Sequence, residues 1–398
     1  MDNLKNLKQI ILIASVAAAL GIIGLLIYLF LPSRVAERKI APGGRGIAGR
    51  IPSVEEPAPN GELGGLTPGM PSENGPSPIT EAGRLVRLTD FSVVSPSLNQ
   101  DESRVLFYKK DGGDLSSSDF NGASQEKISN ITIVGITEAI WSPSRDRAAV
   151  FYLDDETLKS FLHRSTTSVA VLPQNLASFS WSPDGKNVAY IESKNERVNL
   201  VMADAAGKNA KAIATTPLRD AKIRWITADR VAFQTPPSGL AEGFLFIFSR
   251  SAGTFNKIAG PLFGLMSTWS GDGSRVLVSS TGFNGSGLKL VVLDASGKLI
   301  FDTGVGTLAT KCVFAGNQEV FCALPRALTS NSVMPDDYLR GDINTLDKIV
   351  RINVDKKEVT EVFGENSFDA EQLIITKNRD YLFFVNRTDG TLWSIKLK

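Results

Sequence analysis

The sequence contains one histidine and two cysteines in 398 residues. One imidazole excludes metal sites built from several histidines, and two thiols are too few for a four-cysteine site. Lysine and arginine total 43 and aspartate and glutamate 42, so a net charge of +1 leaves no excess of basic residues for nucleic-acid binding. We therefore expect no metal, no cofactor and no nucleic-acid partner.

Short motifs of common enzyme classes are also missing. There is no G-x-S-x-G, no P-loop, no H-E-x-x-H, and no G-x-G-x-x-G between a strand and a helix. A glycosidase needs two carboxylates in one cleft, and neighbours such as Asp336 and Asp337 do not establish such a pair. We expect a protein that is not an enzyme, with an envelope glycan hydrolase as the alternative.

One long apolar run follows a short N-terminal tail, residues 1–9. Residues 10–31 contain no charge over 22 positions, which as a helix spans about 33 Å, enough to cross a bilayer core. A signal peptide has a shorter apolar region and a small-residue cleavage site, which the following residues lack. The run predicts an uncleaved single-pass transmembrane helix, with a removed signal as the alternative.

Residues 32–83 are predicted to be a flexible linker. From 41 to 83 there are 10 glycines and 8 prolines, and this stretch shows almost no apolar periodicity. Such a segment buries too little surface to offset the entropy of ordering. It is expected to carry the folded part, residues 84–398, away from the membrane.

A repeat of about 40–50 residues occupies the rest of the chain. Each copy has an apolar strand end, a polar turn and an alternating apolar strand, as in SWSPDGKNVAY near residue 180. This period in short strands is typical of a β-propeller. The repeated position is held by Val94, Trp141, Trp181, Trp225, Trp269, Phe314 and approximately Ile374.

The residue types in the repeat have structural explanations. Four of the five tryptophans occupy the same position, where a large side chain packs between neighbouring blades. In the Pro-Asp-Gly turn, proline presets φ, aspartate caps the turn and glycine takes a positive φ. Asp184 and Asp272 are therefore expected to be turn residues, and His163 an ordinary strand residue.

The seventh copy ends after its third strand, TLWSIKLK, and would leave an open sheet edge. Residues 84–89, RLVRLT, have the pattern of a fourth strand but precede the first copy. We expect this strand to pair with residues 391–398. The fold class predicted is an all-β, seven-bladed β-propeller closed by an N-terminal strand, preceded by one transmembrane helix and a disordered linker.

The repeat resembles the WD40-like propeller repeat of the TolB type, on residues such as SWSPDGKNVAYIES. A second resemblance, on KCVFAGNQEVFCALP, is to single-span envelope propellers of bacteria. The resemblance covers about residues 84–398 and implies an envelope location more than an activity. TolB itself has an N-terminal α/β domain where this chain has an anchor and linker, so its partners are not implied.

The two cysteines flank a predicted hairpin whose tip is residues 316–318. Pairing residue 313 with 321 sets Cys312 opposite Cys322, within disulfide range. A disulfide indicates an oxidising compartment; two reduced, buried cysteines are the alternative. Lys5 and Lys8 before the apolar run are outnumbered by five basic residues after it, which favours a cytoplasmic propeller. The disulfide and the resemblance favour the opposite side.

The sixth copy carries an insertion, residues 326–348, about 15 residues longer than in the other copies. Long loops on a rigid scaffold commonly carry binding residues. This loop combines an apolar side chain, an aromatic one and charges of both signs, a mixture typical of interfaces. The alternative is a loop that plugs the channel. We expect an extracytoplasmic scaffold that binds an envelope protein or polysaccharide, with a cytoplasmic adaptor as a further alternative. The candidate binding residues are Met334, Asp336, Asp337, Tyr338 and Arg340.

Overall fold

The computed structural model describes residues 81–398 except 130–131, 165–168, 174–175, 195–196, 330 and 365–367. The chain divides into two compact units, Met1–Asn74 and Gly75–Lys398, and the described residues all belong to the second. The predicted tail, the predicted transmembrane helix and residues 32–80 of the predicted linker lie outside the described residues. Within the described ranges, no helix has the length and apolarity needed to span a membrane.

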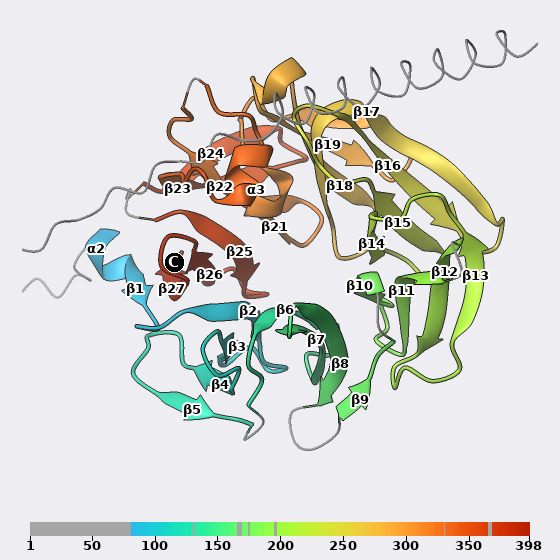
Figure 1. The fold of residues 1–398 in the computed structure, drawn as a ribbon. Helices are drawn as coiled ribbons and strands as arrows, with labels where there is room; N and C mark the ends of the chain where they lie inside the picture. Colours follow the sequence, from blue (N-terminus) through green and yellow to red (C-terminus); the bar gives the residue numbers. More distant parts are fainter. Residues whose placement is uncertain are drawn as a thin grey trace, which may run out of the picture. The chain divides into compact units, whose positions relative to one another are not determined.

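Antiparallel β-sheets make up most of the described chain, as predicted for an all-β fold. Successive sheets follow one another around a common centre, which their first strands face (Figure 1). In the first three sheets the four strands pair in chain order. These strands are β2 (Val93–Leu98), β3 (Val105–Lys109), β4 (Leu115–Ser118), β5 (Gln125–Lys127); β6 (Ile136–Trp141), β7 (Arg147–Asp154), β8 (Thr157–Arg164), β9 (Val169–Val171); β10 (Leu176–Trp181), β11 (Asn187–Lys194), β12 (Arg197–Asp204) and β13 (Lys211–Thr215).

The fourth and fifth repeats share one seven-stranded sheet, which differs from the expected separate four-stranded sheets. The reason is β17, whose first part pairs with β16 and whose last part pairs with β18, with Phe263 paired on both sides. Gly260 and Gly264 have positive φ, so the strand bends between its two roles without breaking. The strands are β14 (Lys222–Trp225), β15 (Arg230–Gln234), β16 (Glu242–Ser249), β17 (Thr254–Trp269), β18 (Arg275–Thr281), β19 (Lys289–Asp294) and β20 (Leu299–Asp302).

The last sheet combines both ends of the described chain. Leu85 pairs with Ile395, so the strand that follows α2 (Glu81–Arg84) is the fourth strand beside the C-terminal one. The predicted strand 84–89 is shorter in the structure, since Arg84 ends α2, and residues 81–83 are helical rather than linker. The strands of the last two sheets are β21 (Cys312–Ala315), β22 (Glu319–Pro325), β23 (Asp347–Asn353), β24 (Glu358–Phe363); β25 (Ala370–Ile375), β26 (Tyr381–Asn386), β27 (Thr391–Lys396) and β1 (Leu85–Arg87).

The apolar core lies between sheets. One cluster joins Trp181 and Tyr190 of the third sheet to Ala149 and Phe151 of the second. A second cluster joins Phe107 and neighbouring apolar side chains of the first sheet to apolar side chains of the last sheet. The Trp181 indole donates a hydrogen bond to the Ile140 carbonyl across the sheet boundary (2.8 Å). Trp141 donates likewise to Ser95 (2.7 Å), whereas the indole nitrogens of Trp225 and Trp269 are buried without a partner.

Polar side chains add a second link between the first strands. A side-chain oxygen on one strand accepts a backbone N–H from the next, which fixes the relative position of the two strands. The pairs are Ser95 with Ala139 (2.8 Å), Ser178 with Ile223 (2.9 Å), Ser180 with Trp225 (2.9 Å) and Gln372 with Ser95 (3.0 Å).

The repeated turns have the expected geometry. The Asp184 carboxylate accepts hydrogen bonds from the Ser182 hydroxyl (2.6 Å) and the Lys186 N–H (3.1 Å), and Gly185 has φ +67°. The Ser182 hydrogen bond lowers the pKa of Asp184. Asp272 accepts from Ser270 in the same way (2.8 Å). Both aspartates stabilise turns.

Candidate binding site at the channel mouth

The first strands of successive sheets line a central channel and run in the same direction. The beginnings of β6, β10 and β14 line a cavity of about 290 Å³, and the ends of these strands line a second of about 490 Å³. Both cavities are lined by Ile140, Ser180 and Arg224, so they are parts of one channel. We call the end where the first strands begin the loop face, and the other end the turn face.

A third cavity, of about 690 Å³, opens on the loop face beside the last sheet and the first two. It shares Thr137 with the 290 Å³ cavity, so the two adjoin at the channel mouth. Its lining includes the charged side chains of Lys110, Glu371, Arg387 and Asp389. The mouth is therefore polar and carries both signs of charge.

Glu371 and Arg387 connect this cavity to the insertion. Burial raises the pKa of the Glu371 carboxyl, although Arg387, whose Nε lies 3.6 Å from Glu371 Oε2, acts in the opposite direction. Arg387 also donates to the carbonyl oxygens of Tyr338 and Ile343, and its guanidinium lies 4.2 Å from the centre of the Tyr338 ring. One arginine thus fixes the insertion to the last sheet.

The insertion joins β22 to β23 and contains the short helix α3 (Asp336–Arg340). Met334 and Tyr338 are 2% and 4% exposed, so both pack inside this chain and hold the loop down. Met334 N–H donates to the Gly285 carbonyl (3.2 Å). A Cβ on Gly239 would lie 2.4 Å from the Met334 carbonyl oxygen, so glycine is required for this close approach.

The charged residues of the insertion have different roles. Asp336 accepts hydrogen bonds from the Ser238 hydroxyl (2.8 Å) and the Gly239 N–H (2.6 Å), which join this loop of the sixth repeat to the β15–β16 loop of the fourth. Asp337 forms an ion pair with Arg340, whose side chain is 58% exposed. Of the five predicted binding residues, Arg340 is thus the one that offers most of its side chain to solvent.

Below the insertion is a buried charged cluster that sequence reasoning missed. Lys311 is 1% exposed, and its ammonium lies 2.6 Å from Asp369 and 2.8 Å from Asp347. It also donates to Thr345 (2.7 Å) and Tyr338 (3.2 Å). Burial acts to raise the pKa of both carboxyls. At Asp369 the Lys311 ammonium and the hydrogen bonds from Thr345 and Tyr338 together outweigh burial and lower the pKa, whereas at Asp347 burial prevails and the pKa is raised.

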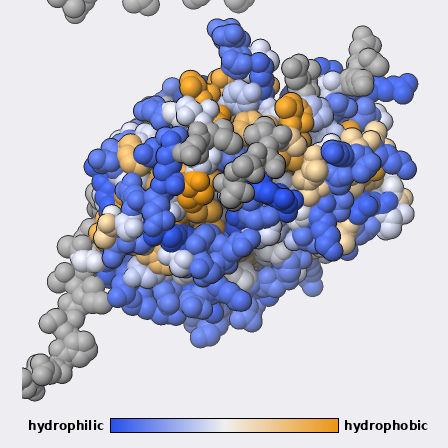
Figure 2. All heavy atoms as spheres, turned by 90° about the horizontal axis from the view of Figure 1, so that it is seen from below, coloured by the Kyte–Doolittle hydropathy of each residue, from blue (hydrophilic) through white to orange (hydrophobic). Residues whose placement is uncertain are grey.

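Exposed apolar side chains gather on the loop face. Figure 2 shows hydrophobic residues as small separate groups on a mainly hydrophilic surface. Among the described residues, seven of the eleven exposed large apolar side chains lie in or beside the loops of the loop face, and the other four lie on or next to outer strands. The seven are Val134, Leu153, Leu158, Leu240, Phe283, Leu339 and Leu346.

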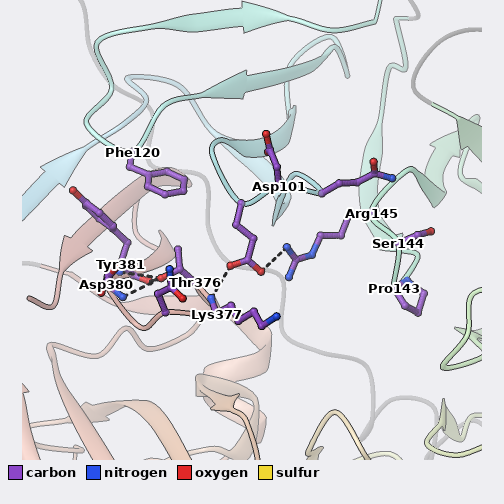
Figure 3. Close-up of a pocket in the computed structure, with 12 residues that line it drawn as sticks. Asp101, Phe120, Pro143, Ser144, Arg145, Thr376, Lys377, Asp380 and Tyr381 are labelled. Carbon is purple, nitrogen blue, oxygen red and sulfur yellow. Dashed lines mark hydrogen bonds and ion pairs between the residues drawn. The ribbon is translucent and has the colours of Figure 1, made fainter.

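The turn face has a pocket of its own, of about 690 Å³ (Figure 3). Glu102 is one of its lining residues, with one carboxylate oxygen 2.9 Å from Arg145 Nη1 and the other accepting the Lys377 N–H (2.6 Å). Phe120 and Tyr381 form another side, with ring centres 5.1 Å apart. The Glu102–Arg145 ion pair and the hydrogen bond from the Lys377 N–H join loops of three sheets, so Glu102 has a structural role in this pocket.

Cys312 and Cys322 are directly opposite in the register of β21 and β22 and form a disulfide, with Cα atoms 4.0 Å apart. Among the described residues, no group of three histidine, cysteine, aspartate or glutamate side chains could hold a metal ion. Glu138 is the single acidic residue among the described residues lining the 290 and 490 Å³ cavities. The paired carboxylates of a glycosidase are therefore not brought together there.

No protein-family model and no curated protein matches the chain. An oligogalacturonate lyase in complex with manganese has a similar fold, with a TM-score of 0.58, 14% identity, and 79% of this chain and 93% of that chain covered. The tricorn protease has a TM-score of 0.50 and 10% identity, with 79% of this chain and 34% of that chain covered. TolB from Acinetobacter baumannii has a TM-score of 0.43 and 14% identity, with 72% of this chain and 65% of that chain covered. This chain spans less than two thirds of the last two structures. At such identities the likeness concerns the β-propeller fold alone.

Proposed function

We propose that this chain is a membrane-tethered, extracytoplasmic β-propeller whose loop face binds a protein or a polymer of the cell envelope. One observation carries the proposal: the channel mouth, the insertion and most exposed apolar side chains occupy the same face. Loops on a rigid scaffold commonly carry binding, and exposed apolar groups mark contact surfaces. The sheets provide the scaffold, and the loops of one face provide the surface.

We further propose that the ring has seven blades and is closed by β1. The support is a set of seven apolar clusters in the described chain, each between two consecutive repeats. One of them lies within the seven-stranded sheet, and one joins the first repeat to the last. Seven units with seven interfaces form a closed ring, whereas an open row would have one interface fewer.

The location rests on two features. The disulfide between Cys312 and Cys322 supports an oxidising compartment, and the uncharged run 10–31 supports a membrane anchor. The basic residues after this run support a cytoplasmic adaptor instead. We weigh the disulfide more heavily because cytosolic disulfides are rare.

A photo-crosslinking amino acid in place of Leu339 tests the binding face. Leu339 lies on α3 and is 49% exposed; Leu299 on the outer strand β20 is 56% exposed and serves as the matched control. In intact cells we expect a discrete adduct from position 339 and none from 299. Equal adducts at both positions, or none at 339, would remove the loop face from the proposal. Deleting the insertion is unsuitable because Met334 and Tyr338 belong to the core.

The location needs an introduced thiol. The native cysteines are bonded and at most 6% exposed, so they are protected from labelling in either compartment. Ala252 lies in an exposed turn and can be replaced by cysteine. A maleimide that does not cross the cytoplasmic membrane should label A252C in intact cells. Labelling that occurs only after lysis would place the propeller in the cytoplasm.

A further inference from the structure

Two basic side chains in the channel have no acidic partner. Lys222 and Arg224 alternate along β14 with buried Ile223 and Trp225, so both basic side chains face the 290 Å³ cavity that they line. Neither has an ion pair, hydrogen bond or ring contact within the described part of the chain. Both side chains are exposed to the solvent of the channel, so their charges are available to a ligand that enters the cavity.

The strand that carries them is firmly held. Ser178 accepts the N–H of Ile223 and Ser180 accepts that of Trp225, each at 2.9 Å. The two basic residues lie two positions apart on one side of β14, with Cα atoms about 6.6 Å apart. Their backbone is therefore fixed before any ligand arrives, which reduces the entropy lost on binding.

The surroundings strengthen any interaction with an anion. Arg224 lies where the two cavities meet and stays exposed to solvent there. The surrounding channel wall removes part of its hydration and lowers the pKa of the guanidinium, which nevertheless stays charged at ordinary pH. A wall of low polarity increases the attraction between charges. Ile140, Phe151 and Phe179 supply apolar surface beside these charges.

We propose that Lys222 and Arg224 form a binding site for the carboxylate of a small organic acid with an apolar body. The planar guanidinium can hold both carboxylate oxygens, and the apolar wall can cover the rest of the ligand. Glu138 in the same cavity repels a doubly charged phosphate more strongly than a singly charged carboxylate. The volume of about 290 Å³ suits a small molecule. This site goes beyond the proposed function and does not depend on it.

Calorimetric titration of the full chain in a neutral detergent tests the site. Benzoate is the probe, benzamide its uncharged equivalent, and inorganic phosphate the alternative anion. We expect saturable binding of benzoate, with a Kd at least tenfold higher in R224Q. The Kd of R224K should be intermediate, because lysine keeps the charge but lacks the planar guanidinium that contacts both carboxylate oxygens. R164Q is the matched control, because Arg164 is an exposed strand residue outside these cavities.

The sign of the Glu138 effect gives an independent check. E138Q removes a like charge and should tighten benzoate binding severalfold. Binding of phosphate but not benzoate would overturn the carboxylate assignment. Equal binding of benzamide, equal weakening by R164Q, or no saturable heat up to about 10 mM benzoate would overturn the site. Near-ultraviolet circular dichroism checks that each variant is folded; if R224Q is unfolded, K222Q and R224K decide.

Discussion

At the scale of single residues, His163 shows how burial changes the pKa of a side chain. It lies on β8, is 2% exposed, and its Nδ1 is 2.8 Å from the Tyr108 hydroxyl oxygen. Burial lowers the pKa of the imidazole, because the charged form loses its hydration. The unfolded chain has an ordinary histidine, which therefore binds a proton at a higher pH than the folded chain.

Stability should fall as the pH decreases below about 6.5, where the unfolded state takes up a proton that the folded state does not. The slope from this single group is at most about 1.4 kcal/mol per pH unit. Urea unfolding at pH 7.5 and 5.0 would measure it, with H163Q as the control that lacks the group. The raised pKa values of Asp347 and Glu371 act in the opposite direction but are common to both proteins. A wild-type minus H163Q difference independent of pH would contradict the assignment.

At the scale of elements, the insertion is held by charge as well as by apolar packing. Tyr338 on α3 donates its hydroxyl to Asp369 (2.8 Å), which also binds Lys311. Asp369 accepts the Thr345 N–H as well (2.9 Å), just before β23 begins. The helix, the following strand and the last sheet therefore meet at one buried ammonium group.

Lys311→Met should lower the free energy of unfolding by about 3–5 kcal/mol, since it leaves two buried carboxylates without a counter-charge. Urea unfolding followed by tryptophan fluorescence would measure the loss. The triple variant K311M/D347N/D369N removes all three charges and should recover part of it. Lys289→Met, at an exposed strand position, is the control for the lost lysine. A triple variant no more stable than K311M would show that the ionic balance is not the cause.

At the scale of the whole molecule, a three-residue strand joins the two ends of the described chain. Leu85 packs in the cluster between the last two sheets, and Val86 packs in the cluster between the last sheet and the first. The strand also covers β27, which would otherwise be an unpaired edge. The paired residues are about 310 positions apart, so this contact does not arise from closeness in the sequence.

The double variant L85D/V86D should destabilise the protein by several kcal/mol, because it places unpaired charges against both clusters. It should also increase self-association through the uncovered edge of β27. Denaturant midpoints and sedimentation velocity would measure the two effects. L299D changes the same residue type at an exposed position and should do neither. A wild-type midpoint for L85D/V86D would show that β1 is not needed for the fold.

The sequence predicted the repeating architecture because the repeat is local. Strand alternation, the Pro-Asp-Gly turn and the tryptophan position all depend on residues within a few positions of each other. The register that sets Cys312 opposite Cys322 was predictable for the same reason, since a short hairpin has few registers. The merging of two repeats through β17 was not, because it depends on bends at two glycines rather than on a pattern.

The candidate site was predicted less well. Periodicity singled out the insertion, but Met334 and Tyr338 turned inward and Lys311 was overlooked. A lysine beside a strand carries no local signal of burial. Its burial becomes possible only because Asp347, at the start of β23, and Asp369, just before β25, approach it. The same holds for Lys222 and Arg224, whose alternation on a short strand is visible but whose shared cavity is not.

The sequence by itself determined the all-β repeat, its turns and the pairing partner of its first strand, since short-range patterns and one missing strand specify these. The tertiary structure alone decided which charges are paired and which face a cavity. Pairing depends on distances of a few ångströms between residues far apart in the chain, and electrostatic energy changes steeply over such distances.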